Sequence, residues 1–105
     1  MGLTRNFKET VQARALKDSA FRIALLEESI NEFLSGDLDI AKSLLRDYVN
    51  SSVSFETLAK RTKISDKSLQ RMLSDKGNPT TSNFCAVLQA IQKIEKVNIG
   101  VKIRH

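Results

Sequence analysis

Turn-forming residues are scarce in this sequence, which has four glycines and one proline in 105 residues. An all-β fold needs many tight turns, so this scarcity argues against one. Cysteine is also rare, because Cys85 stands alone and cannot form an internal disulfide. The single histidine is the terminal His105, which leaves no Cys/His zinc site and no Ser-His-Asp set, and no glycine-rich phosphate loop is present. We therefore expect no enzyme activity, no metal and no cofactor.

Long apolar runs are missing as well. No window approaches the roughly 18 uninterrupted apolar residues of a membrane span. The start, MGLTRNFKETVQARALKD, lacks the apolar region of a secretory signal. Asn6 stands where an N-myristoylation motif needs Ser or Thr. These absences predict a cytoplasmic protein without a membrane partner.

Helix-favouring residues are abundant, and the length is typical of one domain. Apolar spacing and capping residues predict an all-α bundle of five or six helices. The first helix is expected over roughly 5–17, the second from Asp18 or Ser19 to Ser35-Gly36, the third from Asp37 to 50–52, the fourth after Ser54, the fifth after Ser65, and the sixth from Thr80, Thr81 or Ser82. The tail VNIGVKIRH alternates apolar and polar residues, so it is either a short edge strand or a frayed end.

The expected core follows the helical spacing of the apolar residues. Cys85, beside the inward Phe84, is expected to be a small buried hydrophobe. The other inward positions are Phe21 or Ile23, Leu25 or Leu26, Ile30, Phe33 and Leu34, then Ala41, Leu44, Leu45, Tyr48 and Val49, then Phe55, Leu58 and Ala59, then Leu69, Met72 and Leu73, and finally Val87, Leu88 and Ile91.

Charge is distributed unevenly along the chain, whose formal net charge is +5. Residues 23–50 carry six acidic and two basic side chains, whereas the segments on either side are basic. Two surfaces with different partners, one of them nucleic acid, would explain this pattern, and plain solvated faces are the alternative. The acidic side chains that a basic partner would meet are Glu27, Glu28, Glu32, Asp37, Asp39 and Asp47.

Two short predicted helices, SFETLAKRT and SDKSLQRML, are joined by a tight turn. Ala59 is small where the helices would cross, and Ile64 in the turn would enter the core, which is the packing of a helix-turn-helix. The second helix would present its polar side to a DNA groove, where Lys and Arg read guanine and Gln reads adenine. The residues expected to contact DNA are Ser65, Asp66, Lys67, Ser68, Gln70 and Arg71, with Lys76, Asn78 and Thr80 following at a second phosphate-binding position.

The phrases LAKRTKIS, SLQRML and KGNP resemble helix-turn-helix regulators of the XRE class, which have a lambda-repressor-like fold. Nearly the whole chain up to about residue 96 is similar to bacterial HigA-type addiction-module antidotes, most specifically through RDYVN, LAK and KSLQRML followed by GNP. The resemblance implies an antitoxin that neutralises a RelE/ParE-like toxin and represses its own operon at operator DNA. The sequence departs from the class at Lys63, where the turn usually has glycine; a left-handed lysine costs roughly 1 kcal/mol.

The expected organisation is a single domain over 1–105. Helices of 1–50 would serve as the toxin-binding part, 53–96 as the DNA-binding part and 97–105 as a tail. A stand-alone regulator without a toxin, or a module that binds only proteins, remains an alternative. A homodimer is expected because one recognition helix reads few base pairs, so two copies would bind half-sites roughly 34–36 Å apart. The candidate dimer contacts are Ile91 and Ile94 with the tail residues Val97, Ile99, Val101 and Ile103.

Overall fold

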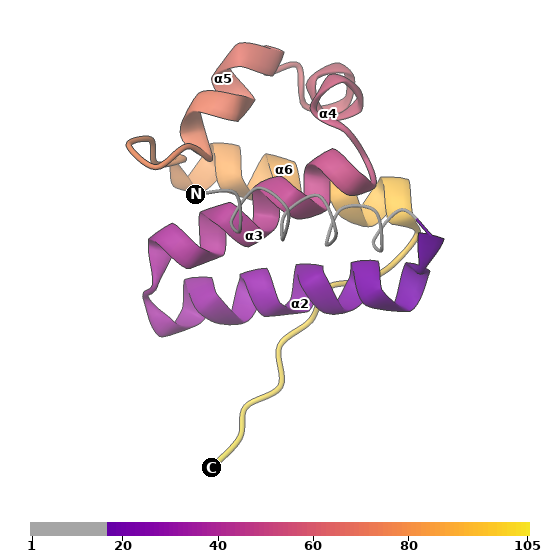
Figure 1. The fold of residues 1–105 in the computed structure, drawn as a ribbon, viewed down its shortest axis with the longest axis vertical. Coiled ribbons are helices and arrows are strands. Elements are labelled where there is room, and N and C mark those ends of the chain that lie inside the picture. The colour runs from indigo at the N-terminus through magenta and orange to yellow at the C-terminus, as the bar shows by residue number, and fades with distance from the viewer. Residues whose placement is uncertain (1–16) are drawn as a thin grey trace, which may run out of the picture.

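Helices form the whole regular structure of residues 17–105, the part of the chain that the computed structural model describes. This confirms the all-α prediction, whereas the helix expected over 5–17 lies almost entirely outside the described residues. No helix within 17–105 is long and apolar enough to cross a membrane. The helices are α2 (Ser19–Ser35), α3 (Leu38–Ser51), α4 (Phe55–Thr62), α5 (Asp66–Met72) and α6 (Thr81–Glu95), arranged with α4 and α5 at one end of the molecule and α2 at the other (Figure 1).

The helices α2 and α3 form an antiparallel pair whose ends follow the sequence signals. The Asp18 side chain accepts a hydrogen bond from the Phe21 backbone N–H at 3.1 Å and so begins α2. Gly36, with φ of 91°, ends α2 in the left-handed conformation that glycine adopts without strain. Asp37 then caps α3, accepting from the Ile40 N–H at 3.3 Å. The predicted boundaries of this pair are therefore confirmed.

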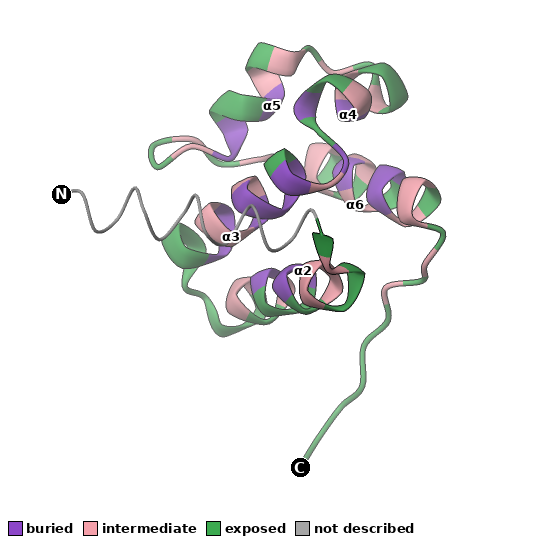
Figure 2. Ribbon diagram, turned by 45° about the vertical axis from the view of Figure 1, so that its right-hand side comes forward, coloured by how far each residue is buried: buried purple, intermediate pink, exposed green. Residues whose placement is uncertain are grey.

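The core lies between the α2–α3 pair and the other helices, as the buried residues in Figure 2 show. Small residues let α2 and α3 approach closely: the buried Ser29 hydroxyl donates to the Ala41 carbonyl at 3.1 Å. Each of the five described helices contributes large side chains to one cluster, which agrees with the predicted core. Its fully buried members include Leu45, Tyr48, Val49, Leu58, Leu69, Leu73, Val87 and Ile91.

Two predicted core positions are wrong. Leu34 is 70% exposed, because it follows Phe33, whose ring packs on Phe84 of α6, and is rotated by about 100° around α2 away from that contact. Cys85 is exposed, since it follows the inward-facing Phe84 and is rotated by about 100° around α6. The inward stripe of α6 continues through Val87 and Ile91 instead.

The tail of residues 97–105 forms no strand, so the possible edge strand is not present. The chain leaves α6 and is held at Ile99, whose backbone N–H donates to the Gln92 side chain at 2.9 Å. Ile99 packs against the core, as does Ile94, while Ile91 is fully buried. The predicted role of Ile91 at a dimer interface is therefore wrong, because it is fully buried in its own chain, while the role of the half-buried Ile94 stays a prediction.

Candidate nucleic-acid interface

The short helices α4 and α5 are each fixed at their first turn by a serine. Ser54 accepts from the Thr57 N–H at 3.1 Å, and Ser65 accepts from the Ser68 N–H at 3.1 Å. A helix of seven or eight residues is marginal alone, so these caps matter more here than in a long helix. Ser65, predicted as a phosphate or base contact, thus uses its hydroxyl to begin α5.

Lys63 makes the turn between α4 and α5 in the left-handed conformation, with φ of 61° and ψ of 20°. Its backbone N–H donates to the Ala59 carbonyl at 2.9 Å and ends α4. Lys63 therefore adopts the left-handed backbone conformation that glycine would adopt without strain. Ile64 follows and packs against the core, as predicted. The turn holds α5 at a fixed angle to α4 and leaves the lysine side chain exposed.

The two sides of α5 differ in chemistry. Leu69, Met72 and Leu73 are buried, which confirms the predicted inward side. Lys67, Gln70 and Arg71 are exposed, and Asp66 and Ser68 are half-buried. The three side chains that the sequence predicts to read DNA bases therefore share one accessible surface of α5. They provide an ammonium, an amide and a guanidinium group.

Gln70 is oriented by its neighbour one turn earlier. Its side-chain amide donates to the Asp66 carboxylate along the exposed side of α5. One amide N–H and the carbonyl oxygen of Gln70 remain available, which are the donor and acceptor that a bidentate contact needs. Asp66 was predicted to contact DNA, and the structure shows its carboxylate accepting this hydrogen bond from Gln70.

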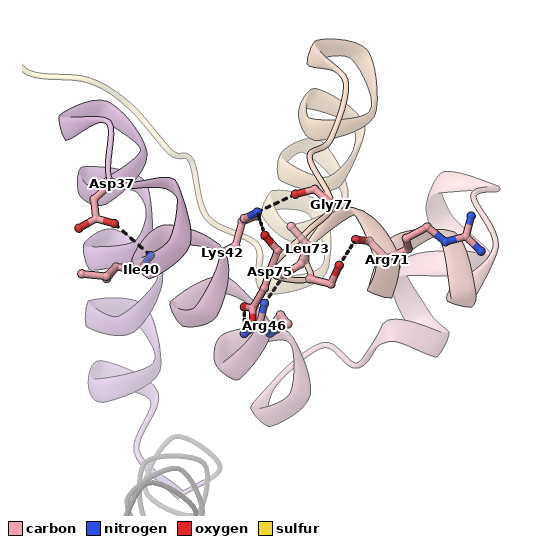
Figure 3. A network of polar contacts seen from close by, with 9 residues as sticks. Asp37, Ile40, Lys42, Arg46, Arg71, Leu73, Asp75 and Gly77 are labelled. Atoms are coloured by element: carbon pink, nitrogen blue, oxygen red, sulfur yellow. Dashed lines mark hydrogen bonds and ion pairs between the residues drawn. The ribbon is translucent and has the colours of Figure 1, made fainter.

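Two basic residues of α3, which the sequence reading did not single out, hold the loop after α5 (Figure 3). Lys42 is only 2% exposed, and its Nζ donates to the carbonyls of Gly77 at 2.6 Å and Asp75 at 3.2 Å. Arg46 donates to the Leu73 carbonyl and pairs with the Asp75 carboxylate at 3.6 Å. These contacts satisfy carbonyls at and beyond the end of α5, where a helix has no internal donors. They also fix where the following loop begins.

Gly77 lies against the backbone of α5 in this loop. A Cβ at this position would overlap the Arg71 carbonyl and come within 3.1 Å of the Met72 Cα. Only glycine allows this approach, which gives a physical reason for the Gly in the KGNP phrase. The loop then exposes Lys76 and Asn78 and reaches Thr80, whose hydroxyl caps α6 by accepting from the Asn83 N–H at 3.1 Å. Lys76, Asn78 and the start of α6 are thus held together beside α5.

The acidic residues in this part of the chain are already engaged. Glu56 pairs with Lys60 at 3.6 Å, and Asp75 is held by Arg46. Within residues 17–105, Lys67 and Arg71 form no ion pair. Asp66, the one acidic residue of α5, accepts from the neutral Gln70 amide, so the accessible side of α5 carries a net charge of +1 from Lys67, Arg71 and Asp66.

The predicted acidic surface is only partly assembled. Glu27, Glu28, Asp37 and Asp39 are exposed on α2 and at the start of α3. Asp47 is buried and cannot belong to it. Two exposed apolar residues, Leu38 and Ile40, lie among the acidic residues at the start of α3 and were not predicted as surface positions.

No cluster of metal-ligating side chains occurs in the described part of the chain. Comparison with protein-family models, with curated proteins and with solved structures finds no match to this chain.

Proposed function

We propose that this protein is a DNA-binding transcriptional repressor of the helix-turn-helix type and the antitoxin of a type II toxin–antitoxin pair. The observation that supports DNA binding is the surface of α5. Lys67, Gln70 and Arg71 are exposed together, while the large exposed apolar side chains of residues 17–105 all lie elsewhere, on α2, α3 and the tail. A module that binds only proteins would place an apolar patch here.

In this proposal α5 enters the major groove of operator DNA. Lys67 and Arg71 donate to the O6 and N7 acceptors of guanine. Gln70, already oriented by Asp66, offers its remaining N–H and its carbonyl to an adenine. Lys76 and Asn78 contact the phosphate backbone from the loop that Lys42 and Arg46 hold, and so fix the register of α5 on the duplex. Dimeric binding to a palindromic operator would supply affinity that one short helix cannot.

The toxin would bind at the start of α3. The start of α3 exposes Leu38 at 45% and Ile40 at 48%, next to the exposed residues Asp37 and Asp39. Apolar residues surrounded by acidic ones suit a basic protein that buries its own apolar residues on contact. A regulator without a toxin is the second candidate, and the exposure of Leu38 and Ile40 favours the antitoxin over it.

Co-expression with the product of the adjacent reading frame, followed by footprinting on the upstream promoter, tests both halves of the proposal. We expect a stable complex with a short basic protein and a protected palindrome. Leu38→Asp with Ile40→Asp should abolish the complex and leave the footprint intact, because these residues are not among the proposed DNA contacts. A footprint without any complex would support the stand-alone regulator, and a complex without a footprint would support the protein-only module.

A further inference from the structure

Helix α4 packs on α6, as Figure 2 shows, and an open cleft of about 230 Å³ lies at this contact. The cleft is lined by Arg61 and Thr62 of α4 and by Ala86, Gln89, Ala90 and Lys93 of α6. Neither α5 nor the loop after it contributes a lining residue. The cleft is therefore separate from the residues that are proposed to contact DNA.

The polar side chains of this cleft are rich in N–H donors. Arg61 and Lys93 bring a guanidinium and an ammonium from two different helices, and both residues are exposed. Gln89 is exposed as well, and its amide forms no hydrogen bond within residues 17–105. The Thr62 hydroxyl is already used, because it donates to the Leu58 carbonyl at 2.7 Å. No carboxylate of the described chain lines the cleft, so its donors meet no acceptor of opposite charge there.

The acidic side chains of the same part of the chain are engaged elsewhere. Residues 53–96, which contain α4, α5 and α6, have four acidic residues. Their partners are Lys60 for Glu56, Gln70 for Asp66, Arg46 for Asp75 and Arg22 for Glu95. Arg61 and Lys93, in contrast, form no ion pair with any residue of 17–105. The two cations of the cleft are therefore uncompensated within the described structure.

Two more lysines follow the cleft residues at positions where the backbone favours glycine. Lys63, directly after Thr62, has φ of 61°, and Lys96, one turn after Lys93, has φ of 58°. Both are exposed, and neither forms an ion pair within the described residues. A side chain in this left-handed region is strained, whereas glycine is not. The chain thus keeps positive charge at the ends of both helices despite the strain, and charges of one sign around a cleft concentrate counter-ions in it.

We propose that the α4–α6 cleft binds a small anion that carries a phosphate group, either inorganic phosphate or a small phosphate ester. A phosphate group carries a charge of about −1.5 to −2 at pH 7, which matches the two cations. The planar guanidinium of Arg61 can donate two hydrogen bonds to it, while Lys93 and Gln89 donate from α6. The volume suits a small ligand, because pockets for drug-sized molecules hold roughly 300–1,000 Å³. This site goes beyond the proposed function and does not rest on it.

Titration of the full chain with inorganic phosphate, followed by NMR at constant ionic strength and without DNA, tests the site. The amide resonances of residues 61–63 and 89–93 should shift and reach saturation in the millimolar range. Arg61→Gln or Lys93→Gln should weaken binding about tenfold, because each removes one charge-assisted hydrogen bond. Lys102→Gln, at an exposed position of the tail, is the matched control and should leave binding unchanged. Shifts that do not saturate, or that persist when both Arg61 and Lys93 are replaced, would overturn the proposal.

Two further measurements identify the source of the phosphate group. The same titration with glycerol phosphate compares an ester with the free ion, and tighter binding of the ester would identify a phosphate ester as the ligand. DNA binding in phosphate-free buffer at physiological salt then separates the cleft from the DNA surface. Arg61→Gln with Lys93→Gln should lower the affinity for DNA no more than about twofold, because charges beyond a Debye length are screened. A loss of affinity as large as that of Lys67→Ala with Arg71→Ala would show that the cleft contacts the DNA backbone instead, and would also overturn the proposal.

Discussion

The two ends of the molecule differ in the side chains that they expose. The α4–α5 end buries its apolar residues and exposes Lys67, Gln70 and Arg71. The end formed by α2, the start of α3 and the tail leaves Leu34, Leu38, Ile40, Val101 and Ile103 exposed. Exposed cations suit a phosphate-rich ligand, while exposed apolar side chains suit protein partners. The comparison teaches that one small chain can expose its cations at one helix pair and its large apolar side chains elsewhere.

At the α4–α5 end the loop backbone lies directly against α5, so Gly77→Ala should lower the stability more than the other substitutions discussed. The new methyl group would overlap the Arg71 carbonyl, so the loop or the end of α5 must move. We expect a loss of about 3 kcal/mol in the free energy of unfolding. Urea denaturation measures it, with Gly100→Ala as the control, because no atom lies within 4 Å of a Cβ placed there. Equal stability of the two variants would show that the loop adapts freely.

Tyr48 lies in the core shared by the two ends, and it sets an alkaline limit to stability. Burial raises the pKa of Tyr48 to about 12, and the nearby Glu95 carboxylate acts in the same direction. The unfolded chain ionises near pH 10 while the folded chain does not, so stability should fall between pH 10 and 12 by about 2–3 kcal/mol.

Below pH 10 the tyrosine is neutral in both states, so its contribution to stability is fully present. Tyr48→Phe should remove this part of the alkaline loss without changing the loss from other groups. Unfolding of both proteins by urea at a series of pH values measures the difference. If the free energies of unfolding of the two proteins fell in parallel above pH 10, ionisation of Tyr48 could not be the cause of the alkaline loss.

Lys42 links the two ends, because it belongs to α3 and holds the loop after α5. Lys42→Met keeps most of the volume but leaves the Asp75 and Gly77 carbonyls without this donor. We expect a loss of about 1–2 kcal/mol in stability and weaker operator binding. Lys93→Met, at an exposed position of α6, is the matched control. Wild-type stability and binding in Lys42→Met would show that the loop is held by other contacts.

Much of this fold could be predicted from local signals. Asp18, Asp37, Ser54 and Ser65 cap the helices where the sequence places caps, because capping depends on residues three positions away. The polar side of α5 was predicted for a similar reason, since helical spacing separates it from Leu69 and Met72.

Long-range contacts could not be predicted in this way. Lys42 contacts Asp75 and Gly77, which are 33 and 35 positions further along the chain, and the sequence around Lys42 does not predict those partners. Leu34 continues an apolar stripe that the local pattern assigned to the core, yet it is 70% exposed in the described part of the chain. Whether Ile94 packs against the core likewise depends on how α6 lies on the other helices, whereas helical spacing did predict the burial of Ile91.

The most direct measurement of the central proposal is operator binding by Lys67→Ala with Arg71→Ala. Each substitution should weaken binding to the upstream promoter by about 1–3 kcal/mol and relax sequence preference. Lys93→Ala with Lys96→Ala removes two exposed charges from the end of α6 and serves as the charge-matched control. Fluorescence anisotropy titrations should show a large loss of affinity for the first protein and a small one for the control. Equal affinities of the wild type and the Lys67/Arg71 variant would contradict the proposed role of α5.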